Sequence, residues 1–250
     1  MKQFLSVLLV ALVPSLVFGQ EHAQSAAHWS YGGASGPQHW GDLEPEYSTC
    51  KTGKHQSPID IRHPERTDLP KLSFDYHPVP LKIVDNGHTI QIDYAPGSFI
   101  TVDKKRYQLV QFHFHHPSEE KIDGHAYDMV AHLVHKDSEG RLAVVAVLLK
   151  QGQSNPLIQT LWDHLPKQVG REEAVANVQV NAADLLPKHT GYYAFEGSLT
   201  TPPCTEGVRW LVLSDSEGIS HSQLNTFSTL FHNNARPTQP VNGRVVKESN

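Results

Sequence analysis

Two short histidine-rich runs with strand-like alternation constrain this chain more than any other feature. The first is Gln111-Phe112-His113-Phe114-His115-His116, and the second is Ala131-His132-Leu133-Val134-His135. Alternate side chains of a strand lie on the same face, so His113 and His115 are expected to project together, away from the two phenylalanines. A return strand can bring His132 beside that pair. Three imidazoles from neighbouring strands predict a zinc site whose fourth position is left for water.

Polar residues elsewhere strengthen this prediction, because an isolated His-x-His pair is more often a surface pair or a buried structural histidine. The segment Pro117-Ser118-Glu119-Glu120-Lys121-Ile122-Asp123-Gly124 holds a carboxylate close to the histidines and ends in a turn signal. Near the C-terminus, Gly197-Ser198-Leu199-Thr200-Thr201-Pro202-Pro203 supplies two adjacent hydroxyls on a segment stiffened by prolines. Taken alone, Glu119 would be interpreted as a solvated loop carboxylate.

Residues 1–19 have the pattern of a secretory signal peptide. Lys2 precedes an apolar stretch from Phe4 to Phe18, and cleavage is expected after Gly19 or, alternatively, within residues 23–27. A membrane anchor is the competing interpretation, but the stretch is short for a span and contains Pro14. No other segment could cross a bilayer. We therefore expect a mature protein of residues 20–250 that is periplasmic or secreted.

Charge and cysteine content narrow the class of protein further. The formal net charge is −5 and there is no basic run, which argues against nucleic acid as a partner. The 17 histidines allow the charge to change steeply between about pH 5 and 8. In an exported protein, the pair Cys50 and Cys204 indicates one disulfide, with two reduced, buried cysteines as the alternative.

Strand patterns dominate the chain after an irregular, Gly- and Pro-rich segment over residues 20–60. The expected strands are 81–84, 88–94, 99–102, 107–116, 127–135, 142–149, 192–196 and 208–213. The run 142–149 is almost wholly apolar and should be a central strand. Helices are expected after Asn155, with Pro156 at the first position, and over about 220–231.

A series of motifs, in order over residues 29–246, resembles the α-class carbonic anhydrases of the bacterial exported type. The motifs are Trp29-x-Tyr31-Gly32, Gly36-Pro37-x-x-Trp40, Gln56-Ser57-Pro58-Ile59-Asp60-Ile61, Asn86-Gly87-His88, the two histidine runs, Ser118-Glu119, Gly197 to Pro203 and Asn234-x-Arg236-Pro237-x-Gln239-Pro240. The resemblance implies a mainly β, α+β fold: a single domain around a large twisted, mostly antiparallel sheet with short peripheral helices.

The resemblance also implies an activity, the reversible hydration of carbon dioxide to bicarbonate and a proton. A zinc ion on His113, His115 and His132 would lower the pKa of its water to about 7, a value that comes from carbonic anhydrase itself, and the hydroxide would attack CO₂. Thr200 aligns with the threonine that orients this hydroxide and passes its own proton to Glu119. His88 aligns with the histidine that exports the proton.

The remaining family positions are carried over in the same way. Thr201 matches the position that contacts bicarbonate, Tyr31 and Asn86 match residues that order waters, and the family favours the Cys50–Cys204 bridge. The hydrophobic pocket for CO₂ corresponds to Val134, Val144, Leu199, Val208 and Trp210, which composition alone would assign to the core. Sulfonamide-type inhibitors are expected to bind, and a homodimer is left open.

Three other functions compete with this one. A zinc-hydroxide esterase would use the same nucleophile, but no separate acyl pocket is evident. A non-catalytic binding module on the same fold typically lacks one of the histidines or the threonine. A His-rich zinc carrier would leave Glu119 and Thr200 unexplained. The other histidines of the motif regions, His39, His116, His125 and His135, are expected not to be ligands.

One position departs from the family pattern. Relatives usually carry a glutamate two residues before the third histidine, where it accepts a hydrogen bond from the outer ring nitrogen, whereas this chain has Val130. Asp128 is too far along the strand to replace it. We therefore expect His132 either to lack a carboxylate partner, with looser zinc and a higher pKa of its water, or to be served by a buried water or a carboxylate from a neighbouring strand.

Overall fold

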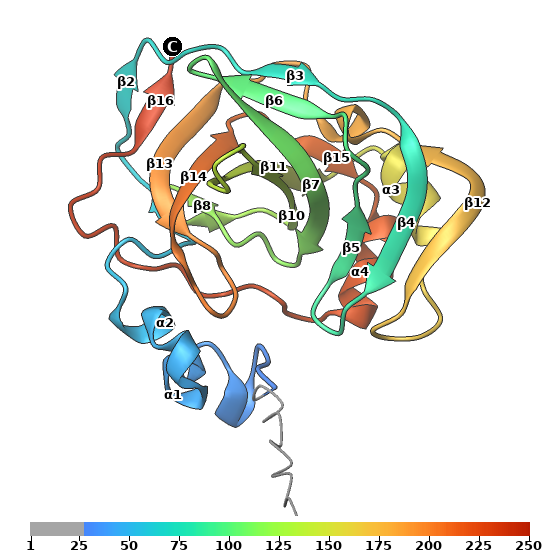
Figure 1. Ribbon diagram of the computed structural model, residues 1–250, viewed down its shortest axis with the longest axis horizontal. Coiled ribbons are helices and arrows are strands. Elements are labelled where there is room, and N and C mark those ends of the chain that lie inside the picture. Colours follow the sequence, from blue (N-terminus) through green and yellow to red (C-terminus); the bar gives the residue numbers. More distant parts are fainter. Residues whose placement is uncertain (1–27) are drawn as a thin grey trace, which may run out of the picture.

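The computed structural model describes residues 28–250, so the proposed signal peptide lies outside the described residues. Within this range, thirteen strands form one large twisted sheet with the main order β12-β4-β5-β7-β10-β11-β14-β13-β16-β2 (Figure 1). β15 pairs with β11, while β3 pairs with β6 and β6 with β7. The strands are β2 (Glu65–Thr67), β3 (Ser73–Asp75), β4 (Val79–Asp85), β5 (Ile90–Asp93), β6 (Phe99–Val102), β7 (Lys105–His115), β10 (Met129–Lys136), β11 (Leu142–Gln151), β12 (Glu172–Val180), β13 (Tyr192–Ser198), β14 (Glu206–Leu213), β15 (Glu217–Ile219) and β16 (Lys247–Ser249).

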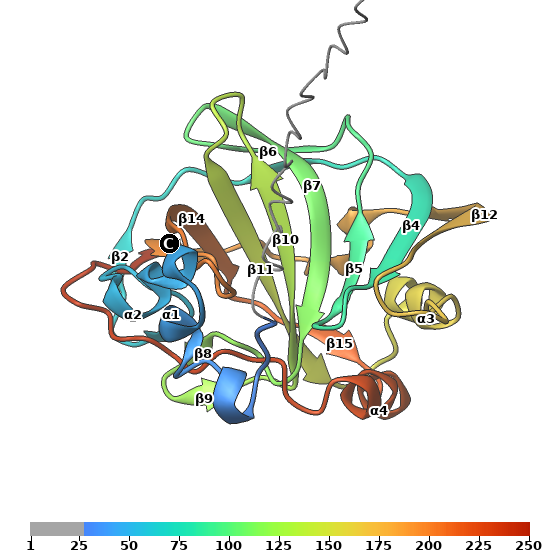
Figure 2. The same ribbon diagram turned by 60° about the horizontal axis from the view of Figure 1, so that its bottom comes forward.

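A smaller sheet and short helices surround the large sheet. The smaller sheet contains β1 (Asp60–Ile61), β8 (Lys121–Ile122) and β9 (His125–Ala126). The α-helices are α1 (Trp40–Leu43), α2 (Thr49–Thr52), α3 (Pro156–Trp162) and α4 (His221–Leu230), and 3₁₀ turns occupy Gly33–Ser35, Pro45–Tyr47 and Ala182–Leu185. The longer helices α3 and α4 lie on the β4 and β12 side of the molecule, while α1 and α2 lie on the opposite side (Figure 2).

The predicted fold class is confirmed, and all eight expected strands are present, with no end shifted by more than two residues. Most strand pairs are antiparallel. The parallel pairs are β11 with β14 and β15, β16 with β2 and, in the smaller sheet, β1 with β8. The helix predictions also hold. The Asn155 side chain accepts a hydrogen bond from the Ile158 N–H, and Ser220 with Gln223 forms a capping box at the start of α4.

The large sheet buries apolar residues on both faces. Along β11, Ala143, Val145 and Val147 pack into one hydrophobic cluster with Phe112 and Phe114, whereas Val144, Ala146 and Leu148 pack into a second cluster with Trp210. This double burial explains why the strand is apolar at nearly every position. Among residues 28–250, no helix is both long and apolar enough to span a bilayer.

Candidate metal centre and active site

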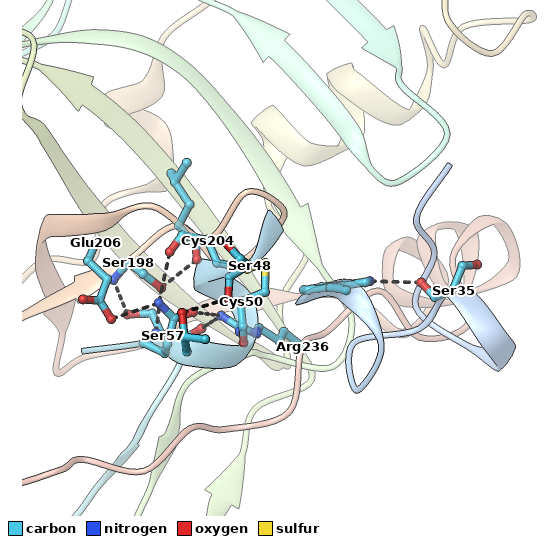
Figure 3. The surroundings of a disulfide bond; sticks show 12 residues. Ser35, Ser48, Cys50, Ser57, Ser198, Cys204, Glu206 and Arg236 are labelled. Atoms are coloured by element: carbon cyan, nitrogen blue, oxygen red, sulfur yellow. Dashed lines mark hydrogen bonds between the residues drawn. A yellow bond between two sulfur atoms is a disulfide. The ribbon is translucent and has the colours of Figure 1, made fainter. Parts of the chain in front are cut away.

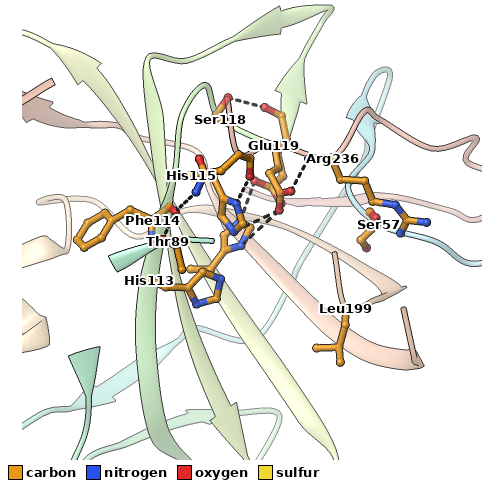
Figure 4. A network of polar contacts seen from close by, with 12 residues as sticks. Ser57, Thr89, His113, Phe114, His115, Ser118, Glu119, Leu199 and Arg236 are labelled. Carbon is orange, nitrogen blue, oxygen red and sulfur yellow. Dashed lines mark hydrogen bonds and ion pairs between the residues drawn. The ribbon is translucent and has the colours of Figure 1, made fainter. Parts of the chain in front are cut away.

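The pairing of β7 with β10 brings the three predicted histidines together. The two strands are antiparallel, and His113 lies directly opposite His132 while His115 lies opposite Val130. One ring nitrogen from each histidine lies within 4.8 Å of the others. Figure 4 shows His113 and His115 on one side of β7 and Phe114 on the other, as the alternation predicts.

The outer nitrogen of each ring has its own hydrogen-bond acceptor. His113 Nδ1 is 2.8 Å from Gln111 Oε1, and His115 Nδ1 is 2.7 Å from the carbonyl oxygen of Asn234. A carbonyl oxygen can only accept, so in each neutral ring the proton is on Nδ1 and the lone pair is on Nε2. Both lone pairs are thereby directed to the common centre.

His132 is held in the opposite sense, through Nε2. This nitrogen is 3.1 Å from Oε2 of Glu120, which leaves Nδ1 to face the other two histidines. The expectation that His132 has no carboxylate partner is therefore wrong. The alternative of a carboxylate partner is correct, but the carboxylate comes from the loop before β8 and not from a neighbouring strand. Asp128 is excluded as that partner, as predicted, because its Oδ2 accepts from the backbone N–H of Gln151 at 2.7 Å.

The donor set fits a zinc ion. His115 Nε2 is buried and has no hydrogen-bond partner among the described residues, although a ring nitrogen in such a place normally has one. Burial, with the neighbouring His132 and His113, holds the pKa of His115 well below its ordinary value, so the ring is neutral and free to donate a lone pair. Three imidazoles, each neutral when it donates its lone pair to the metal, are a donor set typical of catalytic zinc.

Glu119 lies beside this centre and is fully buried. Its Oε2 is 3.5 Å from His115 Nε2 and 3.8 Å from His132 Nδ1, while Oε1 accepts the backbone N–H of Arg236 at 2.8 Å. Burial raises the pKa of Glu119 to about 7, against the opposing effects of His132 and of hydrogen bonds from Thr200 and Arg236. The predicted pair of Thr200 and Glu119 is therefore in contact.

The other residues predicted for the site fall into two groups. Tyr31, Asn86, His88 and Thr201 line one cavity of about 120 Å³ together with His113 and His115. The residues predicted for the hydrophobic pocket belong to the cluster around Trp210: Val144 and Val208 are buried in it, and Val134 and Leu199 pack against it. The Trp210 ring contacts His132 with centroids 4.9 Å apart.

His88 stands on a tight turn at the mouth of this cavity. Gly87 has a φ of +85°, and the Asn86 side chain accepts the backbone N–H groups of His88 and Thr89, both at 3.0 Å. The His88 ring stacks on Trp29 with centroids 3.7 Å apart. Burial, and next the charge of His28, lower the pKa of His88 from its ordinary value.

The segment that carries Thr200 and Thr201 is tied to the N-terminal region by the Cys50–Cys204 disulfide, as predicted (Figure 3). Polar contacts add to this connection. Gln56 Nε2 donates to the Cys204 carbonyl at 3.0 Å, and the buried Arg236 guanidinium donates to the Cys50 carbonyl at 3.1 Å. A disulfide is typical of proteins that mature in an oxidising environment.

Sequence reasoning missed three residues that hold the ligands: Gln111, Glu120 and Asn234. Gln111 could have been found, because it precedes His113 by two residues on the same strand face. Asn234 lies 119 positions from His115 in the chain, and its side chain also donates to the carbonyls of His88 and Phe114 at 2.9 and 3.0 Å. No local pattern indicates such a contact.

Comparisons with known proteins point to a single family. Residues 35–250 match the family model described as eukaryotic-type carbonic anhydrase. A carbonic anhydrase of Pectobacterium carotovorum is 42% identical over 240 residues, covering 96% of this chain and 98% of the relative.

Two solved structures are also similar. A hyperthermostable carbonic anhydrase from an active hydrothermal vent chimney has a TM-score of 0.87 at 48% identity, covering 89% of this chain and 100% of that one. An α-carbonic anhydrase of Thermovibrio ammonificans, solved with the inhibitor sulfanilamide, has a TM-score of 0.85 at 42% identity, covering 88% of this chain and 99% of that one.

Proposed function

Because the chain belongs to the α-class carbonic anhydrase family and is a carbonic anhydrase, we propose that it hydrates CO₂ reversibly at a zinc ion held by His113, His115 and His132. The observation that carries this proposal is the convergence of three ring nitrogens within 4.8 Å, each on a ring whose outer nitrogen is already paired. When bound, zinc lowers the pKa of a coordinated water to about 7, a value known from carbonic anhydrases themselves, and so supplies a nucleophile at neutral pH.

Thr200 and Glu119 orient the attack. One oxygen of Glu119 accepts the Arg236 N–H, which fixes the carboxylate in place. The Thr200 hydroxyl is hydrogen-bonded to this carboxyl group. When Glu119 is ionised it can only accept, so the hydroxyl proton then points to Glu119. The Thr200 oxygen then has a lone pair free to accept a hydrogen bond from the attacking hydroxide. This is orientation, which lowers the entropic part of the barrier.

The apolar residues beside the site receive CO₂. Val134, Val144, Leu199, Val208 and Trp210 belong to or pack against one cluster, and Trp210 contacts the His132 ring. An apolar surface suits an apolar substrate, and the few polar groups beside it set its orientation. Thr201, on the cavity wall next to this surface, contacts the bicarbonate that forms.

His88 carries the proton out. It lines the same cavity as His113 and His115, with Tyr31 and Asn86 also on the wall, so the cavity offers a route along which waters could relay the proton. Its lowered pKa favours release of the proton to buffer at neutral pH. This step follows the chemical one, because the proton leaves when the nucleophile is regenerated.

The cellular location and the binding partners of the enzyme are the remaining parts of the proposal. The disulfide supports an oxidising compartment, and we propose export through a signal peptide at residues 1–19 to the periplasm or the medium. A sulfonamide is expected to bind at the site, on the model of the sulfanilamide complex of the Thermovibrio ammonificans relative. Homodimer formation stays a prediction.

The test is stopped-flow CO₂ hydration on purified protein with its zinc content determined. His132→Ala removes one of three ligands, so it should lose most of the bound zinc and almost all hydration activity. His125→Ala is the matched control, because His125 is exposed on β9 and outside the site. Full zinc content and full activity in His132→Ala would refute the assignment.

A further inference from the structure

Glu120 is a buried carboxylate for which the reaction described above has no use. Its side chain is completely excluded from solvent, and its Oε1 has no hydrogen-bond partner among the described residues. A buried carboxylate is costly unless a partner compensates it. Within residues 28–250, its charge contact is with His132, at 3.1 Å. The contact with His132 therefore compensates the burial of the Glu120 carboxylate.

The loop that carries Glu120 is anchored at each side of it. The Ser118 hydroxyl donates to the Glu120 carbonyl at 2.8 Å, and the backbone N–H of Lys121 donates to the carbonyl of Ile59 at 3.2 Å. The carboxylates of two consecutive residues consequently reach the two sides of one imidazole. Glu119 lies on the Nδ1 side of His132, and Glu120 lies on the Nε2 side.

Position 130, on the strand that carries His132, holds an apolar residue instead of a carboxylate. Val130 lies two residues before His132 on the same strand face, at the position where the family resemblance leads us to expect a glutamate. It is fully buried in the cluster with Ile59 and Ile61. A carboxylate here would compete with Glu120 for one N–H. In this chain the strand position is apolar, and the carboxylate comes from the loop.

We propose that Glu120 is the positioning residue of the metal ligand His132, a loop carboxylate that replaces the strand carboxylate absent at Val130. This inference rests on the proposed zinc function. By accepting the Nε2–H, Glu120 holds the ring in the tautomer that offers Nδ1 to the metal and makes that nitrogen a stronger donor. Because Glu119 is the adjacent residue, one short loop sets both the ligand and the hydroxyl relay.

The test measures metal affinity instead of turnover. Zinc dissociation constants are determined by chelator competition for the wild type, Glu120→Gln, Val130→Glu and the exchange variant Glu120→Val/Val130→Glu. Glu120→Gln should bind zinc about 10–100-fold more weakly, a range that comes partly from carbonic anhydrases. The exchange variant should recover most of this loss. The absorption spectrum of the Co²⁺-loaded proteins should change in Glu120→Gln and return toward that of the wild type in the exchange variant.

Asp128→Asn is the matched control, because Asp128 is a half-buried carboxylate just before the same strand and its partner is the Gln151 N–H, not His132. Its zinc affinity should equal that of the wild type. Zinc affinity of Glu120→Gln within twofold of the wild type would overturn the inference and leave the proposed function intact. A folded wild type without zinc or hydration activity would instead overturn the proposed function. If Glu120→Gln does not fold, Glu120→Asp decides: weakened zinc supports the role, and unchanged zinc contradicts it.

Discussion

At the scale of single residues, the acceptor on the outer nitrogen decides which nitrogen each histidine offers to the shared centre. Gln111 and the Asn234 carbonyl take the Nδ1 protons of His113 and His115, while Glu120 takes the Nε2 proton of His132. Two of these acceptors are neutral and one is charged. The charged acceptor makes the His132 ring the most electron-rich donor of the three, since an anionic acceptor polarises the N–H more strongly.

The role of His88 is also a question at this scale. His88→Ala should lower kcat by at least about tenfold in dilute buffer, toward the low side of the effects of general acid–base groups. The ratio kcat/KM for CO₂ should change little, because proton export follows the chemical step. High concentrations of imidazole should restore the rate. An unaltered kcat in dilute buffer would mean that another group carries the proton.

At the scale of elements, two devices place the site: the antiparallel register of β7 with β10, and the tied segment after β13. The register sets His113 opposite His132 without any help from loops. Thr200, by contrast, is on irregular chain. Its segment is held by a hydrogen bond from the Leu199 N–H to the Thr205 carbonyl at 2.9 Å and by the disulfide at Cys204.

Removing the disulfide should therefore affect both stability and activity. Cys50→Ser/Cys204→Ser should lower the free energy of unfolding by about 2–5 kcal/mol, a range typical of native bridges, and should lower kcat because the Thr200 segment loses an anchor. Urea unfolding and CO₂ hydration measure the two effects. Dithiothreitol should reproduce the change in the wild type and do nothing further to the double variant. Equal stability with and without the bridge would contradict this prediction.

At the scale of the whole molecule, the two faces of the large sheet pack against different hydrophobic clusters. One face carries the three candidate ligands His113, His115 and His132 and the cluster around Trp210, and the other packs the larger core. His135, three positions after His132, points into that larger core, where its Nε2 is 2.7 Å from the Tyr76 hydroxyl. This agrees with the prediction that His135 is not a ligand, and it places a titratable group in the interior.

His135 should make the fold sensitive to acid. Burial lowers its pKa to about 3, against about 6.5 in an unfolded chain. Between these values the unfolded chain binds a proton that the folded chain refuses, so stability falls as the pH falls from about 6.5 to about 3. From pH 7 to pH 5 this one group should cost about 2 kcal/mol.

Urea unfolding of the metal-free protein at pH 7 and pH 5 measures that cost. His135→Gln should lose about 2 kcal/mol less stability between the two pH values than the wild type. His125→Gln, a change on an exposed strand, should behave like the wild type. The prediction fails if the pH dependence of His135→Gln matches that of the wild type.

The alternation of apolar and polar residues, together with helix-start signals, was sufficient to predict most of the longer strands and helices from the sequence. The period of two placed His113 and His115 on one face with the phenylalanines on the other, and the Asn155 cap followed by Pro156 marked the start of α3. The strand β12 was not predicted from the sequence. It is largely exposed, and its pairing with β4 is interrupted near Asn177, which has a φ of +62°. Its exposed and half-buried residues alternate, but the alternation breaks at Asn177, and this break obscures the strand in the sequence.

What only the tertiary structure decided lies in the loops and in contacts across the chain. The directions of the Glu119 and Glu120 side chains follow from anchors at Ile59 and Arg236, which are far away in sequence. No periodicity governs irregular backbone, so the sequence alone left the partner of His132 open. A strand repeats its geometry every two residues and can be predicted from local pattern, whereas a loop takes its geometry from whatever it packs against.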